Sequence, residues 1–153
     1  MIHIFRNIRT IDFPSTDSIE YLQHDAECAP YLDTLISDCV GEVLVNTDFD
    51  ELVGYAFVYN KQYEYAGFIF NVFLYEQYRG YGLGQKLVTD IVNKYDGVDL
   101  TVDKDNIHAV ELYLKNDFVI VQNEISNSEG QYYMKLKSEL DDDDKIVNFQ
   151  PCS

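Results

Sequence analysis

The sequence predicts a single α/β domain of the α+β type, in which about seven strands and four helices alternate along the chain. Three observations lead to this prediction. The 153 residues are enough for one domain with a core of its own. Apolar residues recur with the period of strands in some stretches and of helices in others. In the middle of the chain, an apolar strand, a glycine-rich turn and an amphipathic helix follow one another from Phe68 to Lys94.

The first part of the chain is expected to form one strand and two helices. Residues 2–11 alternate loosely and predict the strand. Residues 14–17 read Pro-Ser-Thr-Asp, which is typical of a helix start, and this helix should end near Cys28. A second helix should follow, with an apolar stripe over residues 32–40 that Gly41 closes.

The rest of the chain predicts six strands and two helices. We expect strands at residues 42–45, 52–59, 68–75, 98–102, 118–121 and 131–136, and helices at residues 83–94 and 106–115. The first two strands should form a hairpin across a polar turn, and the last two should form another across the loop 126–130. The central strand has one polar residue in eight, so we expect both of its faces to be buried.

The glycine-rich turn at residues 79–84 is predicted to bind an anion. It reads Arg-Gly-Tyr-Gly-Leu-Gly, and its glycines let the backbone approach a ligand closely because they carry no Cβ atom. The unpaired N–H groups of the next helix face the same place, and Arg79 and Lys86 add positive charge. A glycine-rich connector without a ligand is the alternative. The spacing fits neither a Walker A loop nor a Rossmann fingerprint.

The run Arg79-Gly80-Tyr81-Gly82-Leu83-Gly84 resembles the Arg-x-x-Gly-x-Gly pyrophosphate signature of the GNAT superfamily of acetyl-CoA-dependent N-acetyltransferases. A second run, from Asn106 to Tyr113 and then Phe118, is similar to the family's Asn-x-x-Ala-x-x-x-Tyr followed by Gly-Phe, with Asp117 in place of the glycine. The resemblance spans about residues 1–137. It implies the GNAT fold, a mixed and largely antiparallel sheet in which strands 4 and 5 splay apart.

The resemblance also implies roles for individual residues, with acetyl-CoA as cosubstrate and no metal. The pyrophosphate would be held by Arg79, Gly80, Tyr81, Gly82, Leu83 and Gly84. The pantetheine arm would enter between the splayed strands, bond the backbone at Val72 and Leu74, and touch Asn106. Tyr113 would be the general acid toward the leaving thiolate, since the pKa of a phenol, ~10, lies above that of an alkyl thiol, ~8.5.

The sequence leaves three candidates for the general base. Glu64 precedes the central strand, and some relatives use a glutamate on or near that strand. His108 lies near the start of a helix and could titrate near neutral pH. A chain of water molecules is the third candidate. Glu64 could equally be an exposed hairpin residue, and His108 a solvated one.

The charge distribution narrows the chemical class of the acceptor and argues against nucleic acid as a partner. The net charge is −16, and from Thr10 to Asn60 there is no Lys or Arg against eleven Asp and Glu. Such a surface repels nucleic acid and attracts cations, although solubility alone could explain it. We expect a cationic acceptor: a polyamine, an aminoglycoside-like amine, or the Lys or N-terminal amine of a peptide. The acids expected to wall its site are Asp17, Glu20, Asp25, Glu27, Asp33 and Asp38.

The reaction expected from these residues is direct transfer of an acetyl group to a primary amine in a ternary complex. One alternative is a catalytically inactive CoA-binding module with a regulatory or interaction role. Another is transfer of a longer acyl group, or transfer to a group other than an amine. Either a monomer or a homodimer is compatible with the sequence.

Composition also predicts the compartment. Three cysteines without a Cys-x-x-Cys pair favour reduced thiols, and the N-terminus has no secretory signal, so a cytoplasmic protein is expected. No apolar run is long enough to span a membrane, and the three histidines and three cysteines form no metal-ligand pattern. We therefore expect neither a membrane nor a metal as a partner.

Residues 139–153 are expected to be an acidic, disordered tail without a part in the chemistry. They include Asp-Asp-Asp-Asp-Lys, which is too charged to pack in a core. The same string is the recognition sequence of a common tag-removal protease, so the segment is either a native tail or a cloning remnant.

Overall fold

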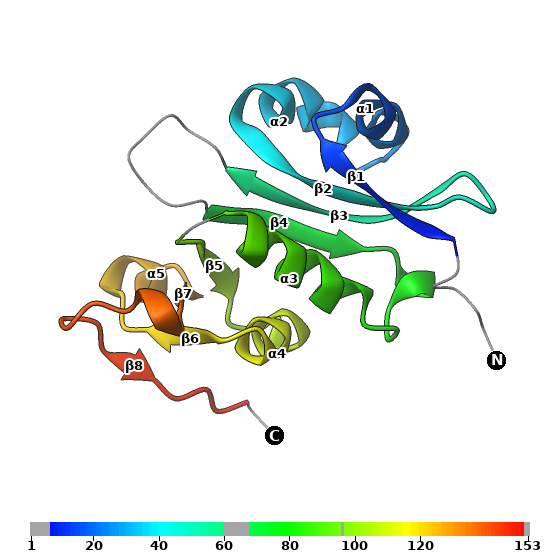
Figure 1. The fold of residues 1–153 in the computed structure, drawn as a ribbon. Coiled ribbons are helices and arrows are strands. Elements are labelled where there is room, and N and C mark those ends of the chain that lie inside the picture. Colours follow the sequence, from blue (N-terminus) through cyan, green and yellow to red (C-terminus); the bar gives the residue numbers. More distant parts are fainter. Residues whose placement is uncertain (1–6, 60–67, 96, 152–153) are drawn as a thin grey trace.

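The computed structural model describes residues 7–59, 68–95 and 97–151. Five α-helices, three short 3-10 helices and eight strands lie in this part of the chain (Figure 1). In chain order they are β1 (Ile8–Phe13), α1 (Thr16–Gln23), η1 (Ala29–Tyr31), α2 (Leu32–Asp38), β2 (Cys39–Asn46), β3 (Glu51–Tyr59), β4 (Phe68–Leu74), η2 (Glu76–Tyr78), α3 (Leu83–Lys94), β5 (Asp99–Asp103), α4 (Ile107–Lys115), β6 (Phe118–Val121), α5 (Glu124–Ser128), β7 (Gln131–Leu136), η3 (Lys137–Glu139) and β8 (Ile146–Val147).

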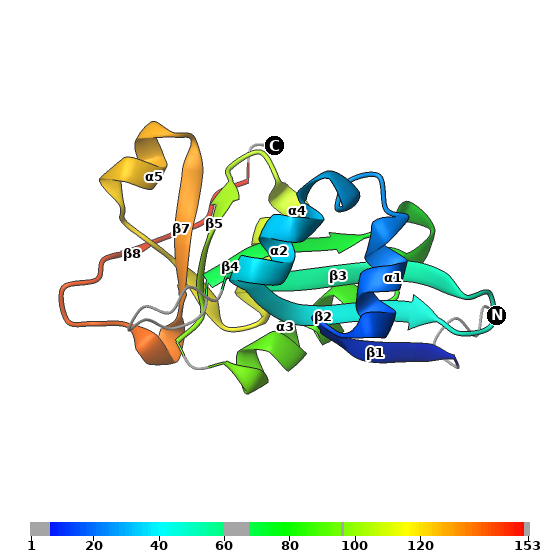
Figure 2. The same cartoon turned by 90° about the horizontal axis from the view of Figure 1, so that it is seen from above.

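The strands form one mixed sheet in the order β1-β2-β3-β4-β5-β7-β6-β8. Every neighbouring pair is antiparallel except β4 and β5, which are parallel. Helices α1 and α2 cover one face of the sheet and α3 and α4 the other (Figures 1 and 2). The predicted α+β class and the mixed, largely antiparallel sheet are therefore confirmed.

Each face of the sheet has its own hydrophobic cluster. Leu22 of α1 and Leu35 of α2 pack over Tyr55 and Phe57 of β3. On the opposite face the apolar stripes of α3 and α4 pack over the other side of the same strands. The stripe of α3 was predicted from its helical spacing, and its buried residues are Leu83, Gly84, Leu87, Val88 and Ile91.

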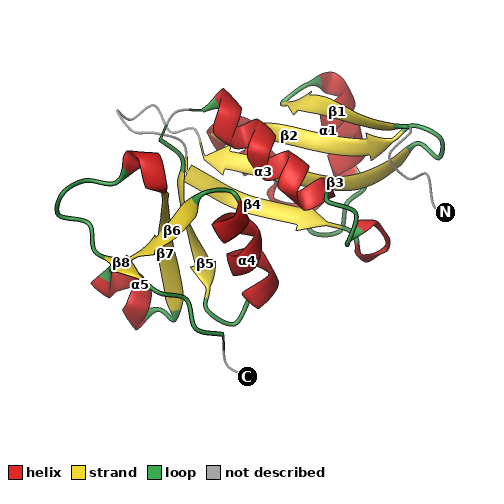
Figure 3. Ribbon diagram, turned by 60° about the horizontal axis from the view of Figure 1, so that its bottom comes forward, coloured by secondary structure: helices red, strands yellow, loops and turns green. Residues whose placement is uncertain are grey.

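Strands β4 and β5 splay apart, as the GNAT fold implies. They pair only at Phe68 with Asp99 and at Ile69 with Leu100, whereas β4 stays paired with β3 as far as Leu74. Beyond Ile69 the two strands diverge, and no strand of the described residues pairs with that edge of β4 (Figure 3). The expectation that β4 is buried on both faces is therefore wrong for residues 71–74. Asn71 is exposed, and residues 72–74 are half-buried.

The first helix is shorter than predicted. Ser15 caps α1 in a capping box with Ser18, and the helix ends at Gln23 rather than near Cys28. It stops there because the Asp25 carboxylate accepts the backbone N–H groups of Glu27 and Cys28, each at 2.8 Å, which holds the chain in a turn.

The predicted end of the second helix is also wrong, because residues 39–41 belong to β2. Gly41 pairs with Phe13 on one side and Phe57 on the other. A Cβ atom at Gly41 would lie 2.0 Å from the carbonyl oxygen of Ala56. This glycine therefore allows close strand packing rather than ending a helix. The first strand runs two residues further than expected, to Phe13, and residues 2–6 of that prediction lie outside the described residues.

The C-terminal part adds two elements that the sequence did not predict. Residues expected to form a loop include the short helix α5, and β8 pairs with β6 at the edge of the sheet. Lys135 holds Asp144 at 2.9 Å, and the ring of Phe149 packs edge-on against Tyr132. One lysine and one aromatic ring thus attach the acidic segment to the domain.

Candidate functional site

The turn between β4 and α3 forms an open site for an anion. Gly80 and Gly82 have φ angles of 85° and 79°, a left-handed backbone that glycine adopts without strain. The first helical bond of α3 runs from the N–H of Lys86 to the carbonyl of Gly82, at 3.1 Å. The N–H groups of residues 83–85 precede it and are left for a ligand. A Cβ atom at either glycine would meet nothing within 4 Å, so the space above the turn is open.

The third glycine has a structural role instead. Gly84 is buried in the first turn of α3. A Cβ atom there would lie 3.4 Å from both Leu74 of β4 and Leu112 of α4. The small residue lets the start of the helix pack against both elements. Of the three predicted glycines, Gly80 and Gly82 form the open turn, and Gly84 lies in the packed first turn of α3.

The two predicted cations near the turn have partners. Arg79 donates from Nε to the carbonyl oxygen of Leu74 at 2.9 Å, and its guanidinium lies 5.9 Å from the centroid of the Phe73 ring. This bond ties the turn to the end of β4. Lys86 instead pairs with Asp90, one helical turn along, at 3.0 Å.

The open edge of β4 presents the backbone of Val72 and Leu74. The N–H of Tyr75 donates to Val53 of β3 at 3.0 Å, so it faces the paired edge. Backbone groups alternate between the two edges of a strand, and those of Leu74 and Val72 therefore face away from β3. The bond from Arg79 to the Leu74 carbonyl agrees with this orientation. These two residues lie where a ligand could pair with β4 in place of a neighbouring strand.

Helix α4 carries the second predicted group of residues. The side chain of Asn106 caps the helix by accepting the N–H of Ala109 at 3.3 Å. Tyr113 is 7% exposed, and its ring packs edge-on against Phe118 with centroids 5.8 Å apart. Burial raises the pKa of Tyr113 to about 12. Asp117 has a φ angle of 65°, so the turn that usually holds a glycine is preserved.

Two side chains were predicted as alternatives for the general base. Glu64 lies outside the described residues. His108 is exposed on α4. No group of three or more His, Cys, Asp or Glu side chains suited to a metal ion is present in ranges 7–59, 68–95 and 97–151.

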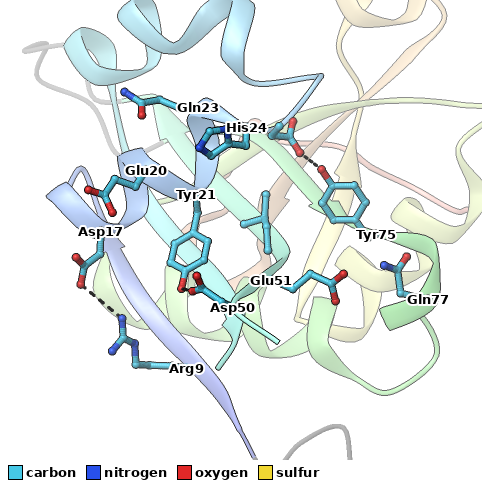
Figure 4. A pocket seen from close by; sticks show the side chains of 12 residues that line it. Arg9, Asp17, Glu20, Tyr21, Gln23, His24, Asp50, Glu51, Tyr75 and Gln77 are labelled. Carbon is cyan, nitrogen blue, oxygen red and sulfur yellow. Dashed lines mark hydrogen bonds and ion pairs between the residues drawn. The ribbon is translucent and has the colours of Figure 1, made fainter. Parts of the chain in front are cut away.

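A cavity of about 790 Å³ lies on the α1 side of the sheet, beside the end of β4 (Figure 4). Its charged lining consists of Arg9, Asp17, Glu20, Asp25, Asp50 and Glu51. Three of these acids were predicted. Three others that were predicted with them, Glu27, Asp33 and Asp38, are not part of the lining.

Asp50 and Glu51 were missed because the sequence presents them as solvated residues of the β2–β3 turn. Only the folding of α1 over this turn brings them to the cavity. The sole signal in the sequence was their place in the long stretch that contains no Lys or Arg.

Three tyrosines hold three of these carboxylates in place. The hydroxyl groups of Tyr21, Tyr75 and Tyr78 donate to Asp50, Asp25 and Glu51, respectively. The Asp50 hydrogen bond raises the pKa of Tyr21, and burial followed by the acid contact raises those of Tyr75 and Tyr78. The phenols therefore stay neutral, and they orient the carboxylates without cancelling their charge.

A model of the acetyltransferase (GNAT) family matches residues 2–118. That is well over half of the chain, and the chain belongs to this family. No curated protein matches it. No helix of the described ranges is long and apolar enough to cross a membrane.

Solved structures of similar fold come from distant relatives. A Bacillus subtilis acetyltransferase in complex with CoA is 18% identical and has a TM-score of 0.62, with 84% of this chain and 97% of that chain covered. An Elizabethkingia anophelis GNAT acetyltransferase with acetyl-CoA bound is 14% identical, with a TM-score of 0.63 and coverages of 86% and 98%. Arabidopsis thaliana NAA60 with a bisubstrate analogue is 18% identical, with a TM-score of 0.59 and coverages of 84% and 94%.

Proposed function

We propose that the protein is an N-acetyltransferase, which moves the acetyl group of acetyl-CoA onto a primary amine by direct attack in a ternary complex. The observation that carries this proposal is the open edge of β4 beside the left-handed glycine turn of α3. Two structures of similar fold hold CoA or acetyl-CoA, and a third holds a bisubstrate analogue, which supports the ternary complex.

The residues present fit this cosubstrate. The N–H groups at the start of α3 and the open space over Gly80 and Gly82 suit a pyrophosphate. The backbone of Val72 and Leu74 would bond the amides of the pantetheine arm, and Asn106 would touch the same arm. Arg79, Tyr81 and Leu83 complete the turn that holds the pyrophosphate, with Gly84 beneath it. Acetyl-CoA supplies a thioester whose carbonyl carbon an amine can attack.

Tyr113 is proposed as the general acid. The amine nitrogen attacks the thioester carbonyl, the carbon–sulfur bond breaks, and the departing thiolate takes the phenolic proton. Since burial raises the pKa of Tyr113 to about 12, the phenol is protonated at neutral pH and donates to the sulfur as the carbon–sulfur bond breaks, and the resulting phenolate regains a proton from water. The proton of the attacking amine leaves through water, with Glu64 and His108 as the side-chain alternatives.

The charged cavity favours a cationic acceptor. Its carboxylates would attract a polyamine, an aminoglycoside-like amine or the amine of a basic peptide, and they would repel the phosphates of nucleic acid. Cys28 and Cys39 are free thiols, in keeping with the proposed cytoplasmic location. Either a monomer or a homodimer is compatible with this function.

Tyr113→Phe distinguishes the enzyme from an inactive CoA-binding module. We expect kcat, followed by release of the CoA thiol, to fall on the order of a hundredfold while CoA affinity stays unchanged. Tyr95→Phe is the matched control. Tyr95 is a half-buried tyrosine at the C-terminal end of α3, whereas the glycine turn lies at the N-terminal end of that helix. Full turnover by Tyr113→Phe would remove this tyrosine from the mechanism. CoA binding by the parent without turnover on any amine would favour the inactive module.

A further inference from the structure

We propose that Tyr78 is a positioning residue for acetyl-CoA, because its phenol holds the glycine turn at residues 79–84 against the closed end of the β2–β3 hairpin. This inference rests on the proposed function and adds to it a residue that acts on the cosubstrate through the turn. It depends on a buried phenol that lies two residues before Gly80 and has two polar partners on the hairpin.

The backbone between β4 and the glycine turn is short and tightly bonded. It contains the 3-10 helix η2 (Glu76–Tyr78). The N–H of Tyr78 donates to the carbonyl of Tyr75 at 3.0 Å, and the N–H of Arg79 donates to the carbonyl of Glu76 at 3.1 Å. Because these bonds fix the backbone up to Arg79, the position of Tyr78 determines where the glycine turn begins.

The side chain of Tyr78 is fixed at both its ring and its hydroxyl. The residue is 4% exposed and belongs to the hydrophobic cluster on the α3 side of the sheet. Its hydroxyl donates to the Glu51 carboxylate and accepts from the Nδ2 amide of Asn46 at 3.2 Å. Asn46 and Glu51 are opposite each other in the register of β2 and β3, at the end where the hairpin turns. One phenol thus bonds both strands of the hairpin.

The bond to Glu51 is the stronger of the two contacts. A hydrogen bond to a carboxylate is stronger than one between neutral groups. Among the described residues, no Lys, Arg or His forms an ion pair with Glu51. Burial, followed by the hydrogen bond to Glu51, raises the pKa of Tyr78, so the phenol keeps the proton that it donates at neutral pH.

The glycine turn needs such support from its neighbours. Gly80 and Gly82 have left-handed φ angles, and glycine has the largest conformational freedom of any residue. On the α3 side the turn is held by Leu83 and Gly84, which are buried. On the β4 side the nearest buried residue in the chain is Tyr78, since Arg79 and Gly80 are exposed. Without the phenolic bonds, fewer molecules would have the turn in the binding conformation, and Kd would rise in proportion.

Calorimetric titration with CoA tests the role of the hydroxyl. Tyr78→Phe keeps the ring in the core and removes the bonds to the hairpin, and we expect its Kd for CoA to be about tenfold above that of the parent. The matched control is Tyr133→Phe, which removes a phenol that donates to Asp99 between β7 and β5. Its Kd for CoA should equal that of the parent. An unchanged Kd in Tyr78→Phe, or the same loss in Tyr133→Phe, would overturn the inference.

Variants of Glu51 test the same bond from its other side, at an exposed position. Glu51→Ala removes the acceptor and should weaken CoA binding as much as Tyr78→Phe does. Glu51→Gln keeps an oxygen that accepts the phenolic proton, so its affinity should stay close to that of the parent. The double variant Tyr78→Phe/Glu51→Ala should bind no more weakly than either single variant, and additive losses of about a hundredfold would refute a shared bond. If Tyr78→Phe does not fold, the two Glu51 variants decide.

A comparison of two acetyl donors distinguishes an effect on the turn from a general loss of structure. S-Acetylpantetheine has the thioester and the pantetheine arm of acetyl-CoA but no pyrophosphate. With spermidine as the acceptor, Tyr78→Phe should raise the KM for acetyl-CoA about tenfold at unchanged kcat and leave kcat/KM for S-acetylpantetheine unchanged. Equal losses with both donors would overturn the inference while the proposed function stands.

The titrations also separate the two proposals. If the parent binds CoA but no amine releases its thiol from acetyl-CoA, the proposed function fails. The Kd values of Tyr78→Phe and Tyr133→Phe then decide on the positioning role alone. A parent protein that binds no CoA would refute both proposals.

Discussion

Replacing Gly82 by aspartate is expected to weaken CoA binding on the order of a hundredfold while leaving the protein folded. The φ angle of 79° costs a residue with a side chain about 1 kcal/mol, and nothing lies within 4 Å of the new Cβ atom. The new carboxylate would lie at the start of α3, within about 5 Å of a bound pyrophosphate. At an effective dielectric constant of about 20, two like charges at that distance repel by about 3 kcal/mol, or on the order of a hundredfold in Kd.

Calorimetric titration with CoA measures the effect, and thermal unfolding measures stability. Gly130→Asp is the matched control, because Gly130 has a φ angle of 74° and equally open surroundings in the α5–β7 turn. Gly82→Ala separates backbone strain from charge. We expect all three variants to lose similar stability, and only Gly82→Asp to lose the hundredfold in affinity. If Gly82→Asp and Gly130→Asp bind CoA equally well, the turn is not the pyrophosphate site.

Two further predictions concern protonation and packing. The folded protein raises the pKa of Tyr113 from ~10 to about 12. The free energy of unfolding therefore has its full contribution from protonated Tyr113 below about pH 10 and loses it as the pH rises toward 12. Because Tyr113 also stays protonated over that range, the plot of kcat against pH should show no descending limb below about pH 10, and a midpoint near pH 9 would contradict Tyr113 as the proton donor. Gly41→Ala should cost about 3 kcal/mol of unfolding free energy in urea, since its Cβ atom would lie 2.0 Å from a backbone oxygen of β3. Gly130→Ala, with open space around it, should cost only about 1 kcal/mol, and equal losses would refute the packing argument.

Local patterns predicted most of the elements, because each had its own signal in the chain. The β2–β3 hairpin, α3, β5, α4 and the β6–β7 pair were all confirmed. The errors fall where one pattern suits two structures. Cys39 and Val40 continue a helical stripe but also fit a strand, and pairing with β1 and β3 decided between them. The helix that was expected to reach Cys28 ends early because Asp25 binds the backbone beyond it.

For the C-terminal segment, the local pattern predicted too little structure. Its composition indicates a solvated tail, and composition cannot show that another strand has an edge free for pairing. Strand β8 forms because β6 offers that edge, and because Lys135 and Tyr132 lie where Asp144 and Phe149 can reach them. Neither condition can be read from residues 139–151 themselves.

The sequence by itself determined the glycine turn, the helix that follows it and the Asn106–Tyr113 segment, because backbone freedom, capping and helical spacing depend on residues close together in the chain. Only the tertiary structure decided that β4 has an open edge, since that depends on where β5, thirty residues later, stops pairing. It also decided which acids lie together, since Asp25 is far along the chain from Asp50 and Glu51 and yet all three line one cavity. A charge count records their sum, but the folded chain sets their positions and the burial of Asp25.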